Sequence, residues 1–115
     1  NFLAQEPGTD EEIQQFCSLT YNVDFPLFAK ISVAGEDKHP LYNTLIHAIP
    51  ERLGEGPWWK DLVDYGLTPN PKPEVLWNFE KFLIGKNGEI VARFAPDITA
   101  DDPRITSAIE AELAK

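Results

Sequence analysis

Two adjacent side chains, Trp77 and Asn78, stand out as residues whose types and spacing could do chemistry. The tryptophan indole donates a hydrogen bond through Nε1, and the asparagine amide both donates and accepts. They lie directly before the apolar segment 79–84, which has the character of a strand. Side by side at the edge of a sheet, they could present two polar groups to one reacting atom. The alternative is structural: a tryptophan packed in a core, followed by an asparagine in a turn.

A second segment, Gln5-Glu6-Pro7-Gly8, favours the chemical interpretation. Together with His39-Pro40-Leu41-Tyr42 and Trp77-Asn78-Phe79, in this order and spacing, it resembles the glutathione peroxidase family. The likeness runs over essentially the whole sequence, and the first and last of these segments are specific signals for that family. The resemblance implies an α/β, thioredoxin-like fold with a central sheet flanked by helices. Residues 1–115 would form one partial domain, the C-terminal two-thirds.

The resemblance also implies an activity, that of an antioxidant oxidoreductase. Such a thiol-dependent peroxidase reduces hydrogen peroxide and organic hydroperoxides to water and alcohols, with thioredoxin or glutathione as reductant and no bound cofactor. In the family, the attacking cysteine or selenocysteine precedes the Gln-Glu-Pro-Gly loop, so we expect it upstream of Asn1, which is not the Met of an intact start. The alternative for the literal 115 residues is a non-catalytic thioredoxin-like fragment or binding module.

Three residues match members of the family's catalytic tetrad: Gln5, Trp77 and Asn78. Their amide and indole groups donate hydrogen bonds and do not titrate near neutral pH. Donors that are fixed in advance can stabilise both a thiolate and a departing oxygen. For Gln5 taken alone, an exposed loop residue is the simpler interpretation, and the Glu-Pro-Gly that follows favours the catalytic one.

The single cysteine, Cys17, lies in a predicted helix. It resembles the resolving cysteine that some family members carry on this helix and that thioredoxin regenerates. However, it comes one position earlier than in the plant-type pattern, which rotates it by about 100° on a helix. A buried, inert cysteine is therefore an equally open interpretation. Because of Cys17 we expect thioredoxin as the reductant, with glutathione as the alternative.

Composition excludes several classes of function. A net charge of −9 argues against nucleic acid and anionic membrane surfaces as partners, because such binding depends on cationic groups. No apolar run approaches the length of a membrane span, so no membrane insertion is expected. Two histidines and one cysteine are too sparse for a zinc site. With no internal disulfide framework, a reducing, cytoplasmic location is the expectation.

The periodicity predicts the elements that must position these side chains. A helix is predicted over 10–20, with Thr9 as its N-cap, and alternation predicts a strand over 30–33. A second helix should begin at Pro40 and end before Pro50. Asn-Gly predicts a hairpin of strands 79–84 and 90–94. An amphipathic last helix should begin at Asp102-Pro103 and dock on the sheet.

The irregular segment 51–74 is rich in Gly and Pro, and a connection of this length is usually functional or part of an interface. We expect a short helix over 58–65 with Trp59, Leu62 and Val63 facing inward. The segment resembles the long insertion of tetrameric family members, so a homo-oligomer through 51–74 and packing within the subunit are both open. Three basic residues near the hairpin could meet a glutathione carboxylate, or simply be solvated: Lys81, Lys86 and Arg93.

Overall fold

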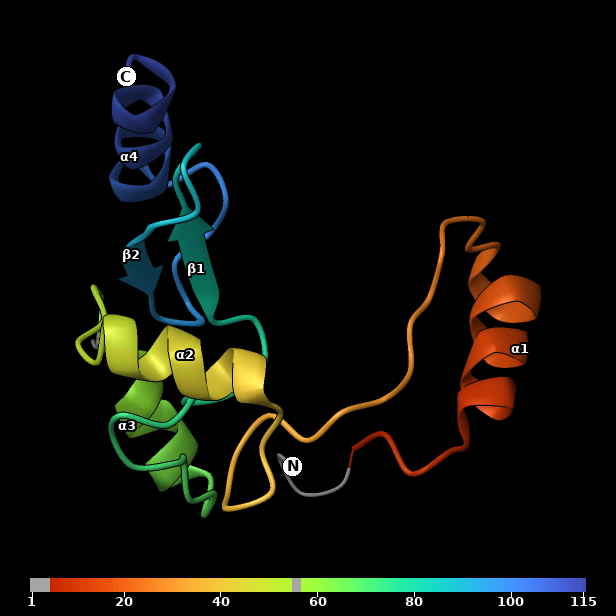
Figure 1. Ribbon diagram of the computed structural model, residues 1–115. Helices are drawn as coiled ribbons and strands as arrows, with labels where there is room; N and C mark the ends of the chain where they lie inside the picture. The colour runs from red at the N-terminus through yellow and green to blue at the C-terminus, as the bar shows by residue number, and fades with distance from the viewer. Residues whose placement is uncertain (1–4, 55–56) are drawn as a thin grey trace.

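The computed structural model describes residues 5–54 and 57–115. Its helices are α1 (Asp10–Tyr21), α2 (Pro40–Ala48), α3 (Pro57–Asp64) and α4 (Pro103–Leu113), and its strands are β1 (Lys81–Ile84) and β2 (Ile90–Phe94). Figure 1 shows the β-hairpin between α4 on one side and α2 and α3 on the other. Helix α1 lies apart from these elements, at the end of a long extended connection.

Helix α1 begins where the sequence predicts and ends at Tyr21, one residue later than predicted. The backbone N–H of Glu12 donates to Thr9 Oγ1 at 3.2 Å, which confirms Thr9 as the N-cap. Three acidic residues occupy the first turn, where the helix dipole favours negative charge. Asn22 ends the helix in the left-handed conformation, with φ of 55°. No residue of α1 is buried, so this helix has few tertiary contacts to hold it.

The second and third helices each bury one side. His39 caps α2, because its Nδ1 accepts the backbone N–H of Leu41 at 3.1 Å, and Pro40 takes the first helical position. In α3, Leu62 is buried and packs against Leu76 and Trp77. The expectation that Trp59 and Val63 also face inward is wrong: they are 47% and 45% exposed. So short a helix contacts the body along one narrow stripe, and Leu62 occupies it.

The predicted hairpin is confirmed, although its first strand begins at Lys81 and not at Phe79. Strands β1 and β2 pair antiparallel, from Lys81 opposite Phe94 to Ile84 opposite Ile90. Its turn needs a glycine at Gly88, where φ is +86°. Leu53 adds a short parallel bridge beside Phe94, so the segment after α2 lies along the outer edge of β2.

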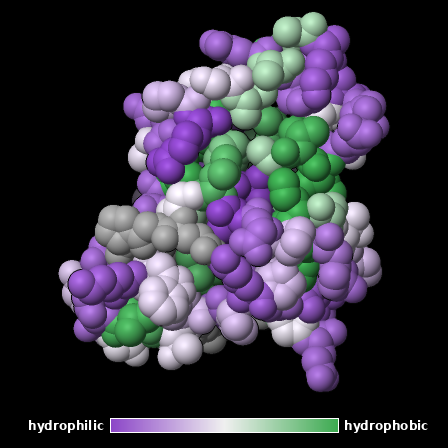
Figure 2. Space-filling view, turned by 90° about the vertical axis from the view of Figure 1, so that its left-hand side faces the viewer, coloured by the Kyte–Doolittle hydropathy of each residue, from purple (hydrophilic) through white to green (hydrophobic). Residues whose placement is uncertain are grey.

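The main core forms where the hairpin meets α4. Phe94, Ala95, Ile98 and Ile105 make one buried cluster. Asp102 caps α4 as predicted, by accepting the backbone N–H of Arg104 at 2.9 Å. Other apolar side chains of α4 stay at the surface, among them Leu113. On the face shown in Figure 2, apolar side chains (green) reach the surface between hydrophilic ones at the height of the hairpin and α4.

One predicted element is absent from the described structure. Residues 30–33 are extended but form no strand, because a strand requires a paired neighbour and the described sheet consists of β1 and β2 only. The alternation of polar and apolar side chains sets the extended backbone, but it cannot supply the partner. Among the described helices, none has the length and apolarity needed to cross a bilayer.

Candidate active site

Gln5 and Asn78, which are 73 positions apart in the sequence, meet in the structure. The side-chain amide of Asn78 donates through Nδ2 to Gln5 Oε1 at 2.6 Å. This bond uses one of the two hydrogens on Asn78 Nδ2 and neither of those on Gln5 Nε2. The pair therefore retains N–H donors that could bind an anion or a departing oxygen.

Trp77 precedes Asn78 and is anchored in a different way. Its side chain is buried and packs with Leu62 of α3 and Leu76. The structural interpretation of Trp77 is thus confirmed in part, since the ring does belong to a core cluster. Packing of the ring also fixes the direction of the backbone that carries Asn78. A core role and a catalytic role are compatible here.

The backbone that leads into Trp77 is held by donors from elsewhere in the chain. The carbonyl oxygens of Val75 and Leu76 accept from Asn70, through Nδ2 at 2.9 Å and the backbone N at 3.4 Å. Those of Pro73 and Glu74 accept from two buried arginines, Arg52 and Arg93. Four consecutive carbonyl groups, those of residues 73–76, are thus hydrogen-bonded before the Trp-Asn pair begins.

The backbone turns sharply directly after Asn78. Phe79 has φ of 68°, in the left-handed region that residues other than glycine seldom adopt. Its ring is 83% exposed, so burial of the ring does not hold this conformation. Strained residues of this kind persist where the surroundings over-determine them, and they cluster at functional sites.

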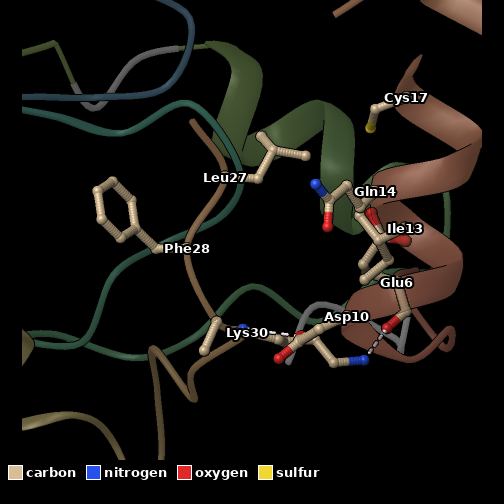
Figure 3. Close-up of a pocket in the computed structure, with 9 residues that line it drawn as sticks. Glu6, Asp10, Ile13, Gln14, Cys17, Leu27, Phe28 and Lys30 are labelled. Carbon is tan, nitrogen blue, oxygen red and sulfur yellow. Dashed lines mark hydrogen bonds between the residues drawn. The ribbon is translucent and has the colours of Figure 1, made fainter. Parts of the chain in front are cut away.

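The other half of the site, the Gln-Glu-Pro-Gly loop, is fixed by a lysine. Lys30 Nζ donates to the carbonyl oxygens of Glu6 at 2.6 Å and Gly8 at 2.8 Å. The backbone N–H of Lys30 also donates to Asp10 Oδ1 at 3.0 Å, at the start of α1 (Figure 3). Sequence reasoning missed Lys30, because nothing local to the lysine marks a contact with a loop more than 20 positions earlier.

Cys17 lies on the side of α1 that faces this extended segment. It is partly buried and lines a cavity of about 330 Å³ between α1 and residues 27–30. Figure 3 shows its sulfur directed into the space between the helix and this segment. Glu6, the neighbour of Gln5, lines the same cavity. Asp10 and Cys17 are separated by about 10 Å along the helix axis.

The basic residues near the hairpin do not form an open anion site. Arg93 is buried, so the expectation that it could meet a glutathione carboxylate is wrong. Lys86 Nζ donates to the carbonyl oxygens of Leu113 and Lys115, at 2.8 and 2.9 Å, and Lys81 Nζ donates to Pro96 O at 3.0 Å. Their proximity to backbone carbonyls could not be read from the sequence. In residues 5–54 and 57–115, no three His, Cys, Asp or Glu side chains gather as a metal site.

Comparisons with known proteins find one family and several relatives that resemble this chain. The family described as glutathione peroxidase matches residues 1–46. The thioredoxin/glutathione peroxidase BtuE of Escherichia coli strain K12 is 47% identical over 99% of this chain, and the match covers 63% of that protein. The hydroperoxy fatty acid reductase Gpx2 of Synechocystis is 39% identical over 97% of this chain and 58% of its own length. The chain therefore spans less than two thirds of either relative.

A solved structure gives the same result for the fold. The crystal structure of Trgpx in its apo form matches the whole chain and 74% of its own, with 29% sequence identity and a TM-score of 0.52. This likeness confirms the predicted thioredoxin-like α/β class. With relatives that match almost the full chain, and with its two characteristic segments joined through Gln5 and Asn78, the chain belongs to the glutathione peroxidase family.

Proposed function

We propose that the protein is a thiol-dependent peroxidase that reduces hydrogen peroxide and organic hydroperoxides to water and alcohols. The observation that carries this proposal is the 2.6 Å hydrogen bond between Asn78 and Gln5. It joins two distant segments through their amide side chains, and Trp77 is packed directly beside it. The amide hydrogens that this bond does not use lie where the two segments meet, and they could donate to a reacting group.

The proposed reaction needs an attacking thiolate or selenolate, which we assign to a residue outside these 115 positions. This anion attacks one peroxide oxygen, the O–O bond breaks, and a sulfenic or selenenic acid forms. The second oxygen leaves with the bonding electron pair and takes up a proton to become water or an alcohol. Gln5, Trp77 and Asn78 would stabilise the anion before attack and the leaving oxygen during it.

Thioredoxin is the proposed reductant, with Cys17 as the resolving cysteine. The sulfenic acid would condense with the Cys17 thiol to release water and form a disulfide, which thioredoxin would reduce by exchange. A disulfide requires Cα atoms within about 7 Å, and we expect α1 to open locally so that Cys17 can reach its partner. Because no residue of α1 is buried, this opening costs few contacts. Glutathione is the alternative, although a net charge of −9 would not steer that anion towards the site.

Three further expectations belong to the proposal. Residues 1–115 would form one partial thioredoxin-like domain in a cytoplasmic protein that binds no cofactor. The segment 51–74 would pack within the subunit through Leu62, which contacts Trp77's cluster. Exposed apolar side chains on the outer face of α3, such as Trp59, would then be available to a second subunit.

The experiment that tests the function is peroxide consumption by the purified full-length protein, with thioredoxin and, separately, glutathione as reductant. Trp77→Ala and Asn78→Ala should each lower the rate constant for the peroxide step by about 100-fold, as loss of one preorganised donor does elsewhere. Glu51→Gln, which changes an exposed charge, is the control and should retain full activity. Absence of consumption by the unmodified protein would favour a non-catalytic binding module.

A further inference from the structure

We propose that Arg52, Glu80 and Arg93 act together as positioning residues for Trp77 and Asn78. We call these three side chains the Arg-Glu-Arg network. The inference rests on the proposed peroxidase function for its kinetic consequence. Its structural content, that the network fixes the Trp-Asn pair, can be tested without activity.

The network is a buried ion-pair cluster. Arg52 Nε donates to Glu80 Oε1 at 2.5 Å, and Arg93 Nη2 donates to Glu80 Oε2 at 3.1 Å. All three side chains are at most 1% exposed. The Arg93 guanidinium also lies over the ring of Phe82, with 5.1 Å between its Cζ and the ring centroid. Each carboxylate oxygen of Glu80 therefore meets a different arginine.

Net stability alone is a weak reason for such a cluster. Removing three charged groups from water is costly, and apolar side chains of similar volume often stabilise a core equally well or better. A buried ionic cluster can instead fix one arrangement of the chain, because any other arrangement leaves a buried charge without its partner. The chain segments that the cluster binds therefore indicate its role.

The network holds the loop that leads into Trp77. Arg52 Nη2 and Arg93 Nη2 both donate to the carbonyl oxygen of Glu74, at 2.7 and 3.0 Å. Arg93 Nη2 also donates to Pro73 O at 2.8 Å. The other terminal nitrogen of Arg93 reaches the segment after α2, at the carbonyl oxygens of Ile49 and Pro50. These bonds join three separate stretches of chain at one point.

The same network holds the chain on the other side of the site. Glu80 is the second residue after Asn78, and Glu74 is the third before Trp77. The Trp-Asn pair is thus bracketed by two positions that share the same two guanidinium groups. Between Asn78 and Glu80 lies Phe79, whose left-handed backbone has no support from its exposed ring. The anchoring of Glu80 accounts for how this strained residue is held in place.

The most conservative test is Glu80→Gln in the full-length protein, which keeps the shape of the side chain and removes its charge. We expect the rate constant for thiol oxidation by hydrogen peroxide to fall by roughly 10 to 100-fold, because small displacements of catalytic groups have effects of this size. Arg52→Lys is the second variant, because it keeps a cation and loses the paired contacts to Glu80 and Glu74. Glu51→Gln alters a surface pair with Lys72 and is the matched control.

The magnetic resonance signal of the Asn78 side-chain amide distinguishes positioning from general destabilisation, because in folded protein it reports the local surroundings of that amide. In folded Glu80→Gln protein we expect these amide signals and the Trp77 indole N–H signal to shift or broaden, while signals from α4 stay in place. In the control variant all of them should be unchanged. Unchanged Asn78 and Trp77 signals in both network variants would overturn the proposal.

A double-mutant cycle then separates positioning from an independent effect. In a Trp77→Phe/Asn78→Ala background, Glu80→Gln should lower the peroxide rate constant by no more than about twofold, because residues that act through one another are not additive. The same fold-loss in both backgrounds would show that the network acts elsewhere, and the inference would fail. If the unmodified protein consumes no peroxide, the proposed function fails, and the amide signals still decide whether the network positions the pair.

Discussion

The Lys30 ammonium and the Gly8 carbonyl oxygen lie 2.8 Å apart, and the same ammonium also holds Glu6 O. The Lys30 side chain thus hydrogen-bonds to the loop on both sides of Pro7, next to Gln5. Hydrogen bonds from a charged donor are stronger than those between neutral groups. Lys30, which lies on another segment, therefore helps to hold Gln5 beside Asn78.

We predict that Lys30→Met slows the peroxide step by about tenfold, because a loosened loop lets Gln5 leave its position beside Asn78. Methionine keeps much of the length of the side chain and lacks the ammonium. Stopped-flow measurement of thiol oxidation in the full-length protein provides the rate. Lys60→Met, at an exposed lysine on α3, is the control and should behave like the unmodified protein. Equal rates for the two variants would contradict the assigned role of Lys30.

Cys17→Ser should abolish turnover with thioredoxin and leave a single round of peroxide reduction intact, because the resolving step follows the peroxide step. Mass spectrometry after one equivalent of peroxide should find a sulfenic acid in the variant and a Cys17 disulfide in the unmodified protein. Ser18→Ala, at the next position on α1, is the control and should turn over normally. Continued thioredoxin turnover by Cys17→Ser would make Cys17 a structural cysteine.

The N-cap of α4 should weaken in acid. The side-chain hydrogen bond from Arg104, followed by the backbone N–H bond, lowers the pKa of Asp102 from its ordinary value of 3.8 to about 2. Because the folded-state pKa lies below the unfolded value, the stabilisation is present above about pH 4 and is lost as the pH falls towards 2. Magnetic resonance titration of the Asp102 carboxyl group measures this pKa directly.

The matched comparison for this titration is Asp102→Asn, which can still cap a helix and cannot titrate. In this variant the backbone N–H signal of Arg104, at the N-cap, should lose the pH dependence between about pH 4 and pH 2 that the unmodified protein shows. A midpoint for Asp102 near its ordinary value would show that the bonds from Arg104 do not persist in solution.

The elements that could be predicted from the sequence are those set by local interactions. Thr9 and Asp102 cap helices through contacts within three residues, and the Asn-Gly turn fixes the hairpin. Residues 30–33 show the limit, because their alternation describes an extended backbone and a strand needs a partner from elsewhere. For the same reason, the local sequence predicts the helix α3 but not the exposure of Trp59, which depends on what the helix packs against.

The candidate site divides in the same way. Gln5, Trp77 and Asn78 could be named from the sequence because their segments resemble those of a family. Lys30 and the Arg-Glu-Arg network could not, because each acts through carbonyl groups of distant residues that no local pattern marks. Arg93 was expected at the surface, where charged residues usually lie. Arg93 can be buried because Glu80, on a neighbouring segment of the chain, supplies the opposite charge.

Two glycines allow the cost of backbone strain to be separated from the cost of steric crowding. Gly54 and Gly66 both have positive φ, of +88° and +79°. A Cβ on Gly54 would overlap Cδ1 of buried Ile98, whereas one on Gly66 would meet nothing within 4 Å. Gly66→Ala should therefore cost only the left-handed strain, about 1–2 kcal/mol of unfolding free energy. Gly54→Ala should cost about 1–3 kcal/mol more, because it also overpacks the core.

Denaturant unfolding of the two variants measures this difference, and a third variant identifies its source. In an Ile98→Val background, which removes the Cδ1 methyl group that the new Cβ would meet, Gly54→Ala should become less costly. The cost of Gly66→Ala should stay the same there, because Gly66 lies in open space. Equal costs at the two glycines would show that Leu53 and its neighbours do not press against Ile98 in solution. A larger cost at Gly54, relieved by Ile98→Val, means that this close approach fixes the segment beside β2, next to Arg52 and its network.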